Sequence, residues 1–451
     1  MPSTLAEELA QGGARVAVIG AGYVGLAMAV ACAEAGYDVV CHDIDRRRVA
    51  EIAAARSPVE TVDSARLRAV LDRGALTATA EASAISGSTV AVICVPTPLA
   101  PGDVPDTTHL EAAARTLGRH LAAPCLVIVE STSYPGSIRE VVLPSLAERL
   151  GRVGEDFYLA CVPERIDPGS RSFSLVNTPR LVGGVSEACT DHATALYRRL
   201  GVPVHPVASP EVAETAKLLE NAFRCVNIAL VNEVMRLCDA LSVEVDAVIE
   251  AAATKPFGYM RFDPGVGVGG ECIPVDPRYL AWRGRRDHLP LPLVELALDV
   301  NAAMPAYAAG QVKQALNARG LAVCGARVLV CGVAYKPNVG DVRNAPALRI
   351  IELLAADGAT VSYHDPHVPE IVVADRTLSS TSLNDEAVRA ADLVALATRH
   401  DGVDHAWLGR TARAFVDLTR RRLDEASPRA VPKHSTGPDP DPHPRSARED
   451  S

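Results

Sequence analysis

Short apolar runs alternate along the chain with longer stretches rich in Ala and Leu. In the first third, the apolar runs predict strands at Arg15–Gly20, Asp38–Asp43, Thr89–Val95, Leu126–Glu130 and Phe157–Val162. Helical stretches separate these runs, and strands that alternate with helices are typical of a parallel sheet covered by helices. The pattern therefore predicts an α/β fold with a doubly wound sheet.

A long helix is predicted after this region. The segment from Glu211 to Ser242 contains neither Gly nor Pro and keeps helical periodicity throughout. At about 1.5 Å per residue, such a helix is longer than a single domain needs. We expect it to join two domains or to line a dimer interface.

A second series of strands and helices begins at Arg327 and resembles the first. A helix is predicted at Pro346–Ala356, and the second strand of each series ends in the same pair, His42-Asp43 and His364-Asp365. Two unrelated α/β units are one interpretation; we favour two nucleotide-binding domains around a helical middle. The expected domains are residues 14–205, 206–310 and 320–425, and the proline-rich, polar residues 426–451 are expected to form a disordered tail.

Composition and charge exclude several classes of protein. Hydrophobic residues make up 48% and charged residues 22%, which is the balance of a folded globular protein. The net charge of −10 gives no basic field for nucleic acid or acidic lipid, so we expect neither partner. The apolar runs are too short to cross a bilayer, and the 11 cysteines form no C-x-x-C or metal-ligating cluster. We expect a cytoplasmic protein with reduced thiols and no metal site.

The first predicted strand leads into a dinucleotide fingerprint. Gly20, Gly22 and Gly25 form G-x-G-x-x-G between a strand and a helix, where glycines permit a tight turn and bring a pyrophosphate close to the helix N-terminus. Asp43 ends the second strand and suits a contact with ribose hydroxyls, which favours NAD over NADP. The arginines Arg46–Arg48 weaken that preference, and a structural turn without a cofactor is the alternative.

The segment Pro264–Tyr279, PGVGVGGECIPVDPRY, indicates covalent chemistry. Glycines precede Cys272 and let main-chain amides approach both the thiol and a ligand, and Asp276 follows four residues later. A thiolate in such a setting attacks a carbonyl carbon. A cysteine that only packs in the core is the alternative, and this is the interpretation that we favour for the other cysteines.

Two further pairs of polar residues fit the same chemistry. Lys217 and Asn221 are spaced i, i+4, so they share one face of the long helix and together could stabilise an oxyanion. A solvated helix face is the more common cause of such spacing. Lys336 and Arg343 lie in and after the first turn of the second series, which lacks the glycine trio, and their charges suit phosphates or a partner domain.

With these residues in view, the chain resembles the UDP-glucose/GDP-mannose dehydrogenase family from about Arg15 to Thr419. The motifs that carry the resemblance are GAGYVG, CVPTP, ESTSYPG, PER, EVAETAKLLENAF, GVGVGGECIPVD and AYKPNVGDVR. The resemblance implies two Rossmann-like domains joined by a long helix that forms a homodimer. It also implies that C6 of a nucleotide-diphosphate sugar is oxidised twice, with NAD, to the uronic acid.

The resemblance also implies roles for individual residues. Cys272 matches the cysteine that forms a thiohemiacetal and then a thioester, and Lys217 and Asn221 match the pair that stabilises negative charge on O6. Asp276 and Thr132 match residues that assist and position the hydrolytic water, and Glu164 matches a glutamate between substrate and cofactor. The implied cofactor contacts are Gly20, Gly22, Tyr23, Val24, Gly25, Asp43, Arg48, Val95, Thr97, Thr132 and Arg343. The implied substrate contacts are Glu164, Arg165, Lys217, Asn221, Gly267, Gly269 and Lys336.

Departures from the glucose-type pattern bear on the substrate. The run PERIDPG has Pro168 in place of a second glutamate, and with ATKPFGYM and GGxCIPVDP it is similar to enzymes that act on UDP-N-acetylhexosamines. UDP-glucose and dTDP-glucose are the alternative substrates. Glu271 stands where that group often has His, and its carboxylate would raise the pKa of the Cys272 thiol unless a cation neutralises it.

Two other classes of function are alternatives. One is a two-electron NAD-dependent alcohol or hydroxyacid dehydrogenase, in which Cys272 would only pack. The other is a protein that binds a nucleotide sugar without catalysis.

Overall fold

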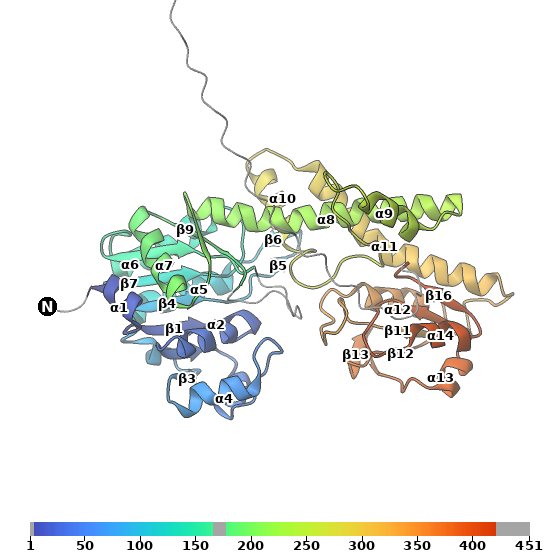
Figure 1. The fold of residues 1–451 in the computed structure, drawn as a ribbon, viewed down its shortest axis with the longest axis horizontal. Helices are drawn as coiled ribbons and strands as arrows, with labels where there is room; N and C mark the ends of the chain where they lie inside the picture. The colour runs from blue at the N-terminus through green and yellow to red at the C-terminus, as the bar shows by residue number, and fades with distance from the viewer. Residues whose placement is uncertain (1–3, 166–176, 421–451) are drawn as a thin grey trace, which may run out of the picture.

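The computed structural model describes residues 4–165 and 177–420. Two α/β parts lie at opposite ends of a helical middle (Figure 1). Pro168 and the predicted tail at 426–451 lie outside the described residues.

Within those residues the first sheet contains eight strands, in the order β10-β9-β8-β7-β4-β1-β2-β3. They are β1 (Arg15–Ile19), β2 (Asp38–His42), β3 (Leu76–Thr79), β4 (Val90–Ile93), β7 (Cys125–Val129), β8 (Phe157–Cys161), β9 (Arg180–Gly184) and β10 (Val204–Val207). The five predicted strands are confirmed, with ends displaced by one or two residues.

The prediction of a parallel sheet was wrong for one pair of neighbours. β9 runs antiparallel to β8, whereas the other neighbouring strands of this sheet are parallel. β9 and the short strands β3 and β10 were not predicted. The reversal brings Arg180, at the start of β9, beside the carboxyl end of β8, and its Nη1 donates a hydrogen bond to the carbonyl of Pro163 (3.2 Å).

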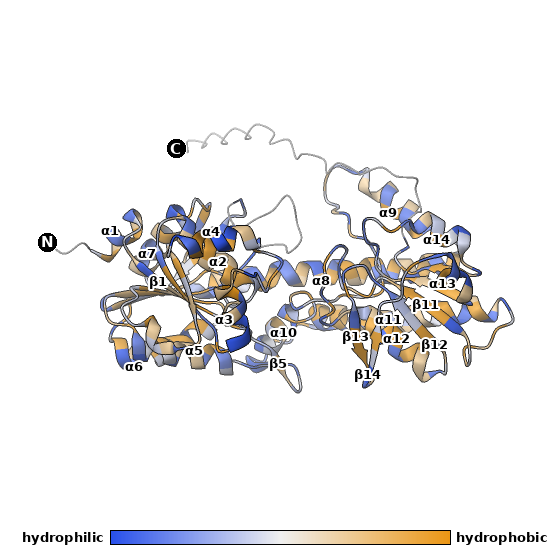
Figure 2. Cartoon of the chain, turned by 90° about the horizontal axis from the view of Figure 1, so that it is seen from below, coloured by the Kyte–Doolittle hydropathy of each residue, from blue (hydrophilic) through white to orange (hydrophobic). Residues whose placement is uncertain are grey.

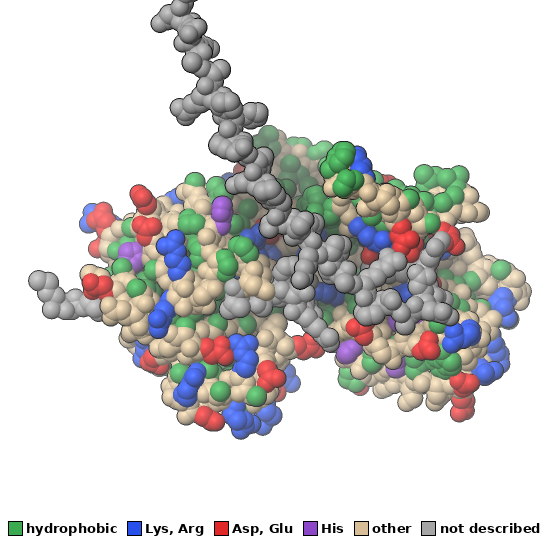
Figure 3. Space-filling view, viewed as in Figure 1, with side chains coloured by type: hydrophobic (Ala, Val, Ile, Leu, Met, Phe, Trp, Pro, Cys, Tyr) green, Lys and Arg blue, Asp and Glu red, His purple; other side chains and the backbone are tan. Residues whose placement is uncertain are grey.

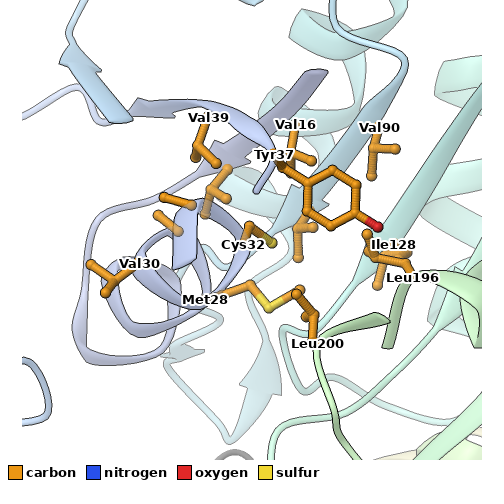
Figure 4. Packing of buried hydrophobic residues seen from close by; sticks show 14 of the residues in the cluster. Val16, Met28, Val30, Cys32, Tyr37, Val39, Val90, Ile128, Leu196 and Leu200 are labelled. Carbon is orange, nitrogen blue, oxygen red and sulfur yellow. The ribbon is translucent and has the colours of Figure 1, made fainter. Parts of the chain in front are cut away.

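Helices cover both faces of this sheet, and the hydropathy colours place apolar residues along its strands (Figure 2). On one face α2 (Tyr23–Glu34) and α7 (Glu187–Arg199) pack their apolar residues on the strands. Figure 4 shows Met28 and Cys32 of α2 and Leu196 of α7 against Val16, Val90 and Ile128. On the other face lie α5 (Thr108–His120) and α6 (Leu143–Leu150). Strands covered on both sides need apolar residues at successive positions, which explains runs such as VAVI.

The helical middle contains α8 (Pro210–Leu241), α9 (Val245–Ala253), α10 (Asp276–Arg286) and α11 (Pro292–Asn317). The hydroxyl of Ser209 accepts a hydrogen bond from the amide of Val212 and caps α8, which ends at Ser242 in the left-handed conformation. The predicted long helix is confirmed to within one residue at each end. Figure 1 shows α8 extending from the first sheet towards the second. No helix of the described segments has the length and apolarity of a membrane span.

The second sheet is parallel, in the order β12-β11-β15-β16. Its strands are β11 (Arg327–Cys331), β12 (Thr360–His364), β15 (Leu393–Leu396) and β16 (Phe415–Asp417), and α12 (Pro346–Ala356) is found where it was predicted.

The second of the two repeated acidic residues is satisfied within its own domain. Asp365 accepts hydrogen bonds from the amides of Val333 (2.7 Å) and Ala334 (3.0 Å), and its Oδ2 lies 3.0 Å from Nε2 of His400. The amide of Asn338 donates to Nδ1 of His400 (3.0 Å), so Nε2 carries the proton that binds Asp365. The carboxylate after β12 is therefore bonded to a histidine of its own domain.

Candidate active site

The glycine turn after β1 has the geometry of a dinucleotide site. Gly20 has a φ of +94°, and a Cβ on Gly25 would lie 1.8 Å from the carbonyl oxygen of Gly20. A Cβ on Gly22, in contrast, would have no atom within 4 Å. Gly20 and Gly25 are thus required for the turn and its packing. The surface at Gly22, in contrast, is open. It lies beside the first residues of α2, Tyr23 and Val24, and the N-terminus of a helix attracts anions. These features fit a bound NAD.

Asp43, the predicted ribose contact, directly follows β2 and binds the glycine turn. Its carboxylate is buried and accepts hydrogen bonds from the amides of Ala21 (2.7 Å) and Asp45 (2.8 Å) and from Nη1 of Arg48 (3.0 Å). Arg46 forms an ion pair with Glu81 (2.9 Å). Two of the three arginines that could favour a 2′-phosphate are therefore paired with carboxylates.

The loops after β4 and β7 are tied together at the same edge of the sheet. The Thr97 hydroxyl donates to the carbonyl of Thr132 (2.5 Å), and the Ser131 hydroxyl donates to the carbonyl of Val95 (2.7 Å). These bonds hold three predicted cofactor contacts, Val95, Thr97 and Thr132, close together.

Cys272 lies among the polar residues that were predicted to work with it. The amide of Asp276 donates to the carbonyl of Cys272 (2.8 Å), and the side chain of Asn221 donates to Oδ2 of Asp276 (2.5 Å). Lys217, Asn221 and Asp276 are buried, with at most 6% of each exposed. Because both α8 residues are buried here, the interpretation of a solvated helix face was wrong.

The charges of this cluster affect two pKa values. Burial, followed by the charge of Asp276, raises the pKa of the Cys272 thiol to about 11, and Lys217 opposes the increase. Burial likewise raises the pKa of Asp276 to about 6, against the lowering effects of Lys217 and Asn221. Glu164, buried at the carboxyl end of β8, raises both values. Cys272 is therefore a thiol at neutral pH, and Asp276 is suited to exchange protons near neutrality.

The glycines before Cys272 pack against the rest of the protein. A Cβ on Gly269 would lie 2.6 Å from Cβ of Tyr335, and one on Gly267 would lie 3.0 Å from the carbonyl oxygen of Asn301 on α11. The amide of Gly270 donates to the carbonyl of Arg343 (2.8 Å). This loop is thus held between α11 and the turn after β11, which also carries the half-buried Lys336.

Arg343 connects all three parts of the chain. Its Nη1 lies 2.6 Å from a carboxylate oxygen of Glu271, and its guanidinium also binds Asp341. The same group lies 5.8 Å from the ring centroid of Tyr23, the first residue of α2. Burial is the main cause of the raised pKa of the Tyr23 phenol, and the nearby Cys272 and Glu164 add to the increase. The glycine turn before α2, the loop of Cys272 and the C-terminal α/β part therefore meet at one place.

Arg165 faces a carboxylate of its own chain. It makes two hydrogen bonds with Glu220 of α8 (2.6 and 3.2 Å) and a third with the carbonyl of Pro179 (2.7 Å). These contacts attach the end of β8 to α8, and a role for Arg165 in binding substrate stays a prediction.

Sequence reasoning missed three groups near the site. Arg224, one helical turn beyond Asn221 on α8, lowers the pKa of both Cys272 and Asp276, and its spacing from Lys217 and Asn221 could have identified it. Glu214 is a buried acid whose pKa burial raises to about 7. Arg180 is fully buried, 4.0 Å from Glu130.

The expectation of buried cysteines was wrong for Cys324, which is exposed because it lies in a surface turn.

Family comparison covers the same three parts of the chain. The NAD binding domain of the UDP-glucose/GDP-mannose dehydrogenase family matches residues 14–201, its central domain matches 211–303 and its UDP binding domain matches 329–422.

Individual relatives match over most of their length. UDP-N-acetyl-D-mannosamine dehydrogenase of Pyrococcus horikoshii is 37% identical over 420 residues, which are 92% of this chain and 97% of that protein. A solved structure of the Pyrococcus horikoshii enzyme superposes with a TM-score of 0.82 at 36% identity, covering 92% of this chain and 97% of that one. UDP-N-acetyl-D-glucosamine 6-dehydrogenase of Pseudomonas aeruginosa is 35% identical over 356 residues, 78% of this chain and 83% of that protein.

A solved UDP-glucose dehydrogenase from Pyrobaculum islandicum superposes with a TM-score of 0.81 at 28% identity, covering 90% of this chain and 98% of that one. The predicted resemblance, the Rossmann-like fold and the NAD cofactor are confirmed by these matches. The chain belongs to the UDP-glucose/GDP-mannose dehydrogenase family and is an NAD-dependent oxidoreductase.

Proposed function

We propose that this enzyme oxidises C6 of a nucleotide-diphosphate sugar to the carboxylate in two steps, with the intermediate bound covalently to Cys272. The observation that carries the proposal is the burial of a lysine, an amide and a carboxyl group around this cysteine. A dehydrogenase that stops at the aldehyde or ketone requires no thiol at this point.

In the first oxidation, Lys217 and Asn221 bind O6 and stabilise the negative charge that develops on it. Asp276 accepts the O6 proton, for which a pKa of about 6 is suitable. NAD, when bound, would supply the acceptor for the hydride that C6 loses in each oxidation. Gly22 and the N-terminus of α2 would face the pyrophosphate of NAD, and Asp43 would face its ribose. Arg343 would contact the cofactor from the C-terminal domain.

The second oxidation needs a tetrahedral carbon that still carries hydrogen. The sulfur of Cys272 adds to C6 of the aldehyde while the thiol proton passes to O6, which gives a thiohemiacetal. Loss of a hydride from C6 and a proton from O6 gives a thioester. Water then adds to C6 with help from Asp276 and Thr132, the C–S bond breaks, and the two water protons pass to the thiol and to solvent.

We further propose that the sugar is a UDP-N-acetylhexosamine, either UDP-N-acetylglucosamine or UDP-N-acetylmannosamine. The two relatives with 37% and 35% identity carry these substrates in their names, and the motifs PERIDPG and ATKPFGYM agree with them. Lys336 and the backbone at Gly267 and Gly269 would bind the nucleotide diphosphate. UDP-glucose is the second candidate, because a UDP-glucose dehydrogenase has a closely similar fold.

The NADH yield with limiting sugar tests both parts of this proposal. Each of UDP-N-acetylglucosamine, UDP-N-acetylmannosamine, UDP-glucose and dTDP-glucose is supplied in turn with excess NAD. Two NADH per sugar with one of the acetamido sugars is the expected result. One NADH per sugar, together with normal turnover of Cys272→Ser, would overturn the covalent mechanism; two NADH only with a glucose nucleotide would overturn the sugar assignment.

We also propose a homodimer formed along α8. This helix exposes Leu219, Phe223, Leu230, Leu237 and Leu241, each by 45% or more, and Leu293 and Leu296 of α11 are also exposed. Figure 3 shows hydrophobic side chains along the upper edge of the molecule, where these helices lie. The α8 positions are separated by four or seven residues, the spacing of a helix-packing stripe, so a second copy of the chain would cover them.

A further inference from the structure

Glu214 is a buried acid that the mechanism above does not use. It lies on α8, one turn before Lys217, and is only 4% exposed. Its carboxylate accepts three hydrogen bonds, from the amide of Gly136 (2.7 Å), the hydroxyl of Ser137 (2.6 Å) and the amide of Ile138 (3.1 Å). Glu214, Lys217 and Asn221 are separated by three and four residues, so they form one buried stripe on the helix.

The three donors belong to the segment that carries Thr132. On the upstream side, Thr97 and Ser131 fix this segment to the loop after β4. In the middle, Tyr134 packs with Leu218 of α8 and Tyr279 of α10. On the downstream side, Glu214 binds Gly136–Ile138, where the helical turn Ile138–Val142 begins. The last of these attachments is a direct polar link between Thr132's segment and the helix of Lys217.

Two acids of α8 bind this segment, Glu214 in the interior and Glu211 at the surface. Glu211, on the same helix, forms an ion pair with Arg139 (2.6 Å) at the surface, and the Cys161 thiol at the end of β8 is influenced by both acids. A carboxylate at the start of a helical segment is favoured by the helix dipole. Removing it would leave two amides and a hydroxyl without their acceptor in a buried site.

We propose that Glu214 is a positioning residue, which fastens the segment of Thr132 to the helix of Lys217 and Asn221 and thereby sets the rate of thioester hydrolysis. This inference rests on the proposed function. The two hydride transfers involve Lys217, Asn221 and Cys272, whereas the hydrogen bonds of Glu214 come from Gly136, Ser137 and Ile138. The water that attacks the thioester, in contrast, is aligned by the segment that Glu214 holds.

The test compares Glu214→Gln with Glu211→Gln, a matched control that removes an acid from the same helix and the same neighbouring segment. Each enzyme is mixed with excess NAD and sugar, and intact-mass spectrometry measures the fraction of chains that carry the sugar on Cys272. For Glu214→Gln we expect kcat to fall by about tenfold to hundredfold, as for a misplaced reacting group, with kcat/KM for the sugar nearly unchanged and an acyl adduct on most chains. Glu211→Gln should behave as wild type.

A second variant and a second measurement guard against a folding defect. Ser137→Ala removes one of the three donors and should give an intermediate adduct fraction. Hydrogen exchange of the peptide covering residues 131–142, measured without NAD or sugar, should be faster in Glu214→Gln and unchanged in Glu211→Gln. A loss of kcat without adduct in both Glu214→Gln and Ser137→Ala would overturn the inference, whereas one NADH per sugar in the wild type would overturn the proposed function instead.

Discussion

Glu271 and Arg343 form an ion pair of 2.6 Å between the loop of the candidate nucleophile and the C-terminal domain. The sequence raised the question of whether a carboxylate next to Cys272 would make the thiol harder to ionise. Arg343 binds this carboxylate, and burial and Asp276 are the main causes of the high thiol pKa.

Arg343→Met should therefore make Cys272 less reactive in the absence of NAD and sugar. The ion pair is half exposed, so the expected decrease in the rate of iodoacetamide alkylation is at most about fivefold, the effect of an exposed pair. Peptide mass spectrometry should follow Cys272, because the exposed Cys324 also reacts. Arg343→Met combined with Glu271→Gln should restore the wild-type rate; a slow double variant would contradict this explanation.

Alkylation of Cys272 should increase steeply with pH. Burial raises the thiol pKa to about 11, so the thiolate fraction below that pH rises by about tenfold per pH unit. The measurement is the alkylation rate between pH 7 and pH 10 in the absence of NAD and sugar. A rate that is already constant above pH 8 would mean that the thiol is ionised there, contrary to this prediction.

Asp276→Asn should change thiol reactivity and turnover in opposite directions. The carboxylate of Asp276 raises the pKa of Cys272, so its removal should speed alkylation several-fold at pH 8. Turnover should fall by about 100-fold or more, because a general base is lost. Asp287→Asn, at the end of the same helix, is the control and should change neither quantity. Slower alkylation of Asp276→Asn would show that this carboxylate activates the thiol.

Replacing glycines of the fingerprint by alanine should lower stability at one position and cofactor binding at another. Gly25→Ala places a Cβ 1.8 Å from a backbone oxygen and should lower the melting temperature by several degrees. Gly22→Ala meets no atom within 4 Å, so the fold should keep its stability while NADH binding, followed by fluorescence, weakens by about tenfold or more as the pyrophosphate loses its approach. Unchanged NADH binding in Gly22→Ala would place the cofactor elsewhere.

Charges placed on the apolar stripe of α8 should separate the proposed dimer. Leu230→Glu combined with Leu237→Glu puts two carboxylates on positions that are 55% and 58% exposed in the single chain. Sedimentation velocity should show a dimer for the wild type and a monomer for this variant. Val372→Glu, at an exposed position on the C-terminal domain, is the control and should remain dimeric. A monomeric wild type would overturn the proposed assembly.

Features that depend on neighbouring residues could be predicted from the sequence. The fingerprint and α8 follow from local rules for turns and helix periodicity, and the spacing of Lys217 and Asn221 identified their shared face. The strand β9 was missed because its five residues include two glycines, and its direction depends on pairing with β8 rather than on its own pattern.

Features that depend on distant partners could not be predicted. Glu214 binds donors 76 to 78 residues away in the sequence, and nothing near it in the chain distinguishes it from Glu211. The effect of Glu271 on the pKa of the Cys272 thiol likewise depends on Arg343, which belongs to a different domain.

The single dinucleotide fingerprint of the described residues has a kinetic consequence. The turn after β11 lacks the three glycines, and Asp365 there is bonded to His400, so the described part of the chain offers a dinucleotide one glycine turn, at Gly20–Gly25. Under the proposed mechanism, both hydrides are delivered there, so the first NADH departs and a fresh NAD+ arrives in mid-reaction. The covalent bond to sulfur then keeps the half-oxidised sugar on the enzyme while the cofactor is exchanged, so that the aldehyde does not diffuse away.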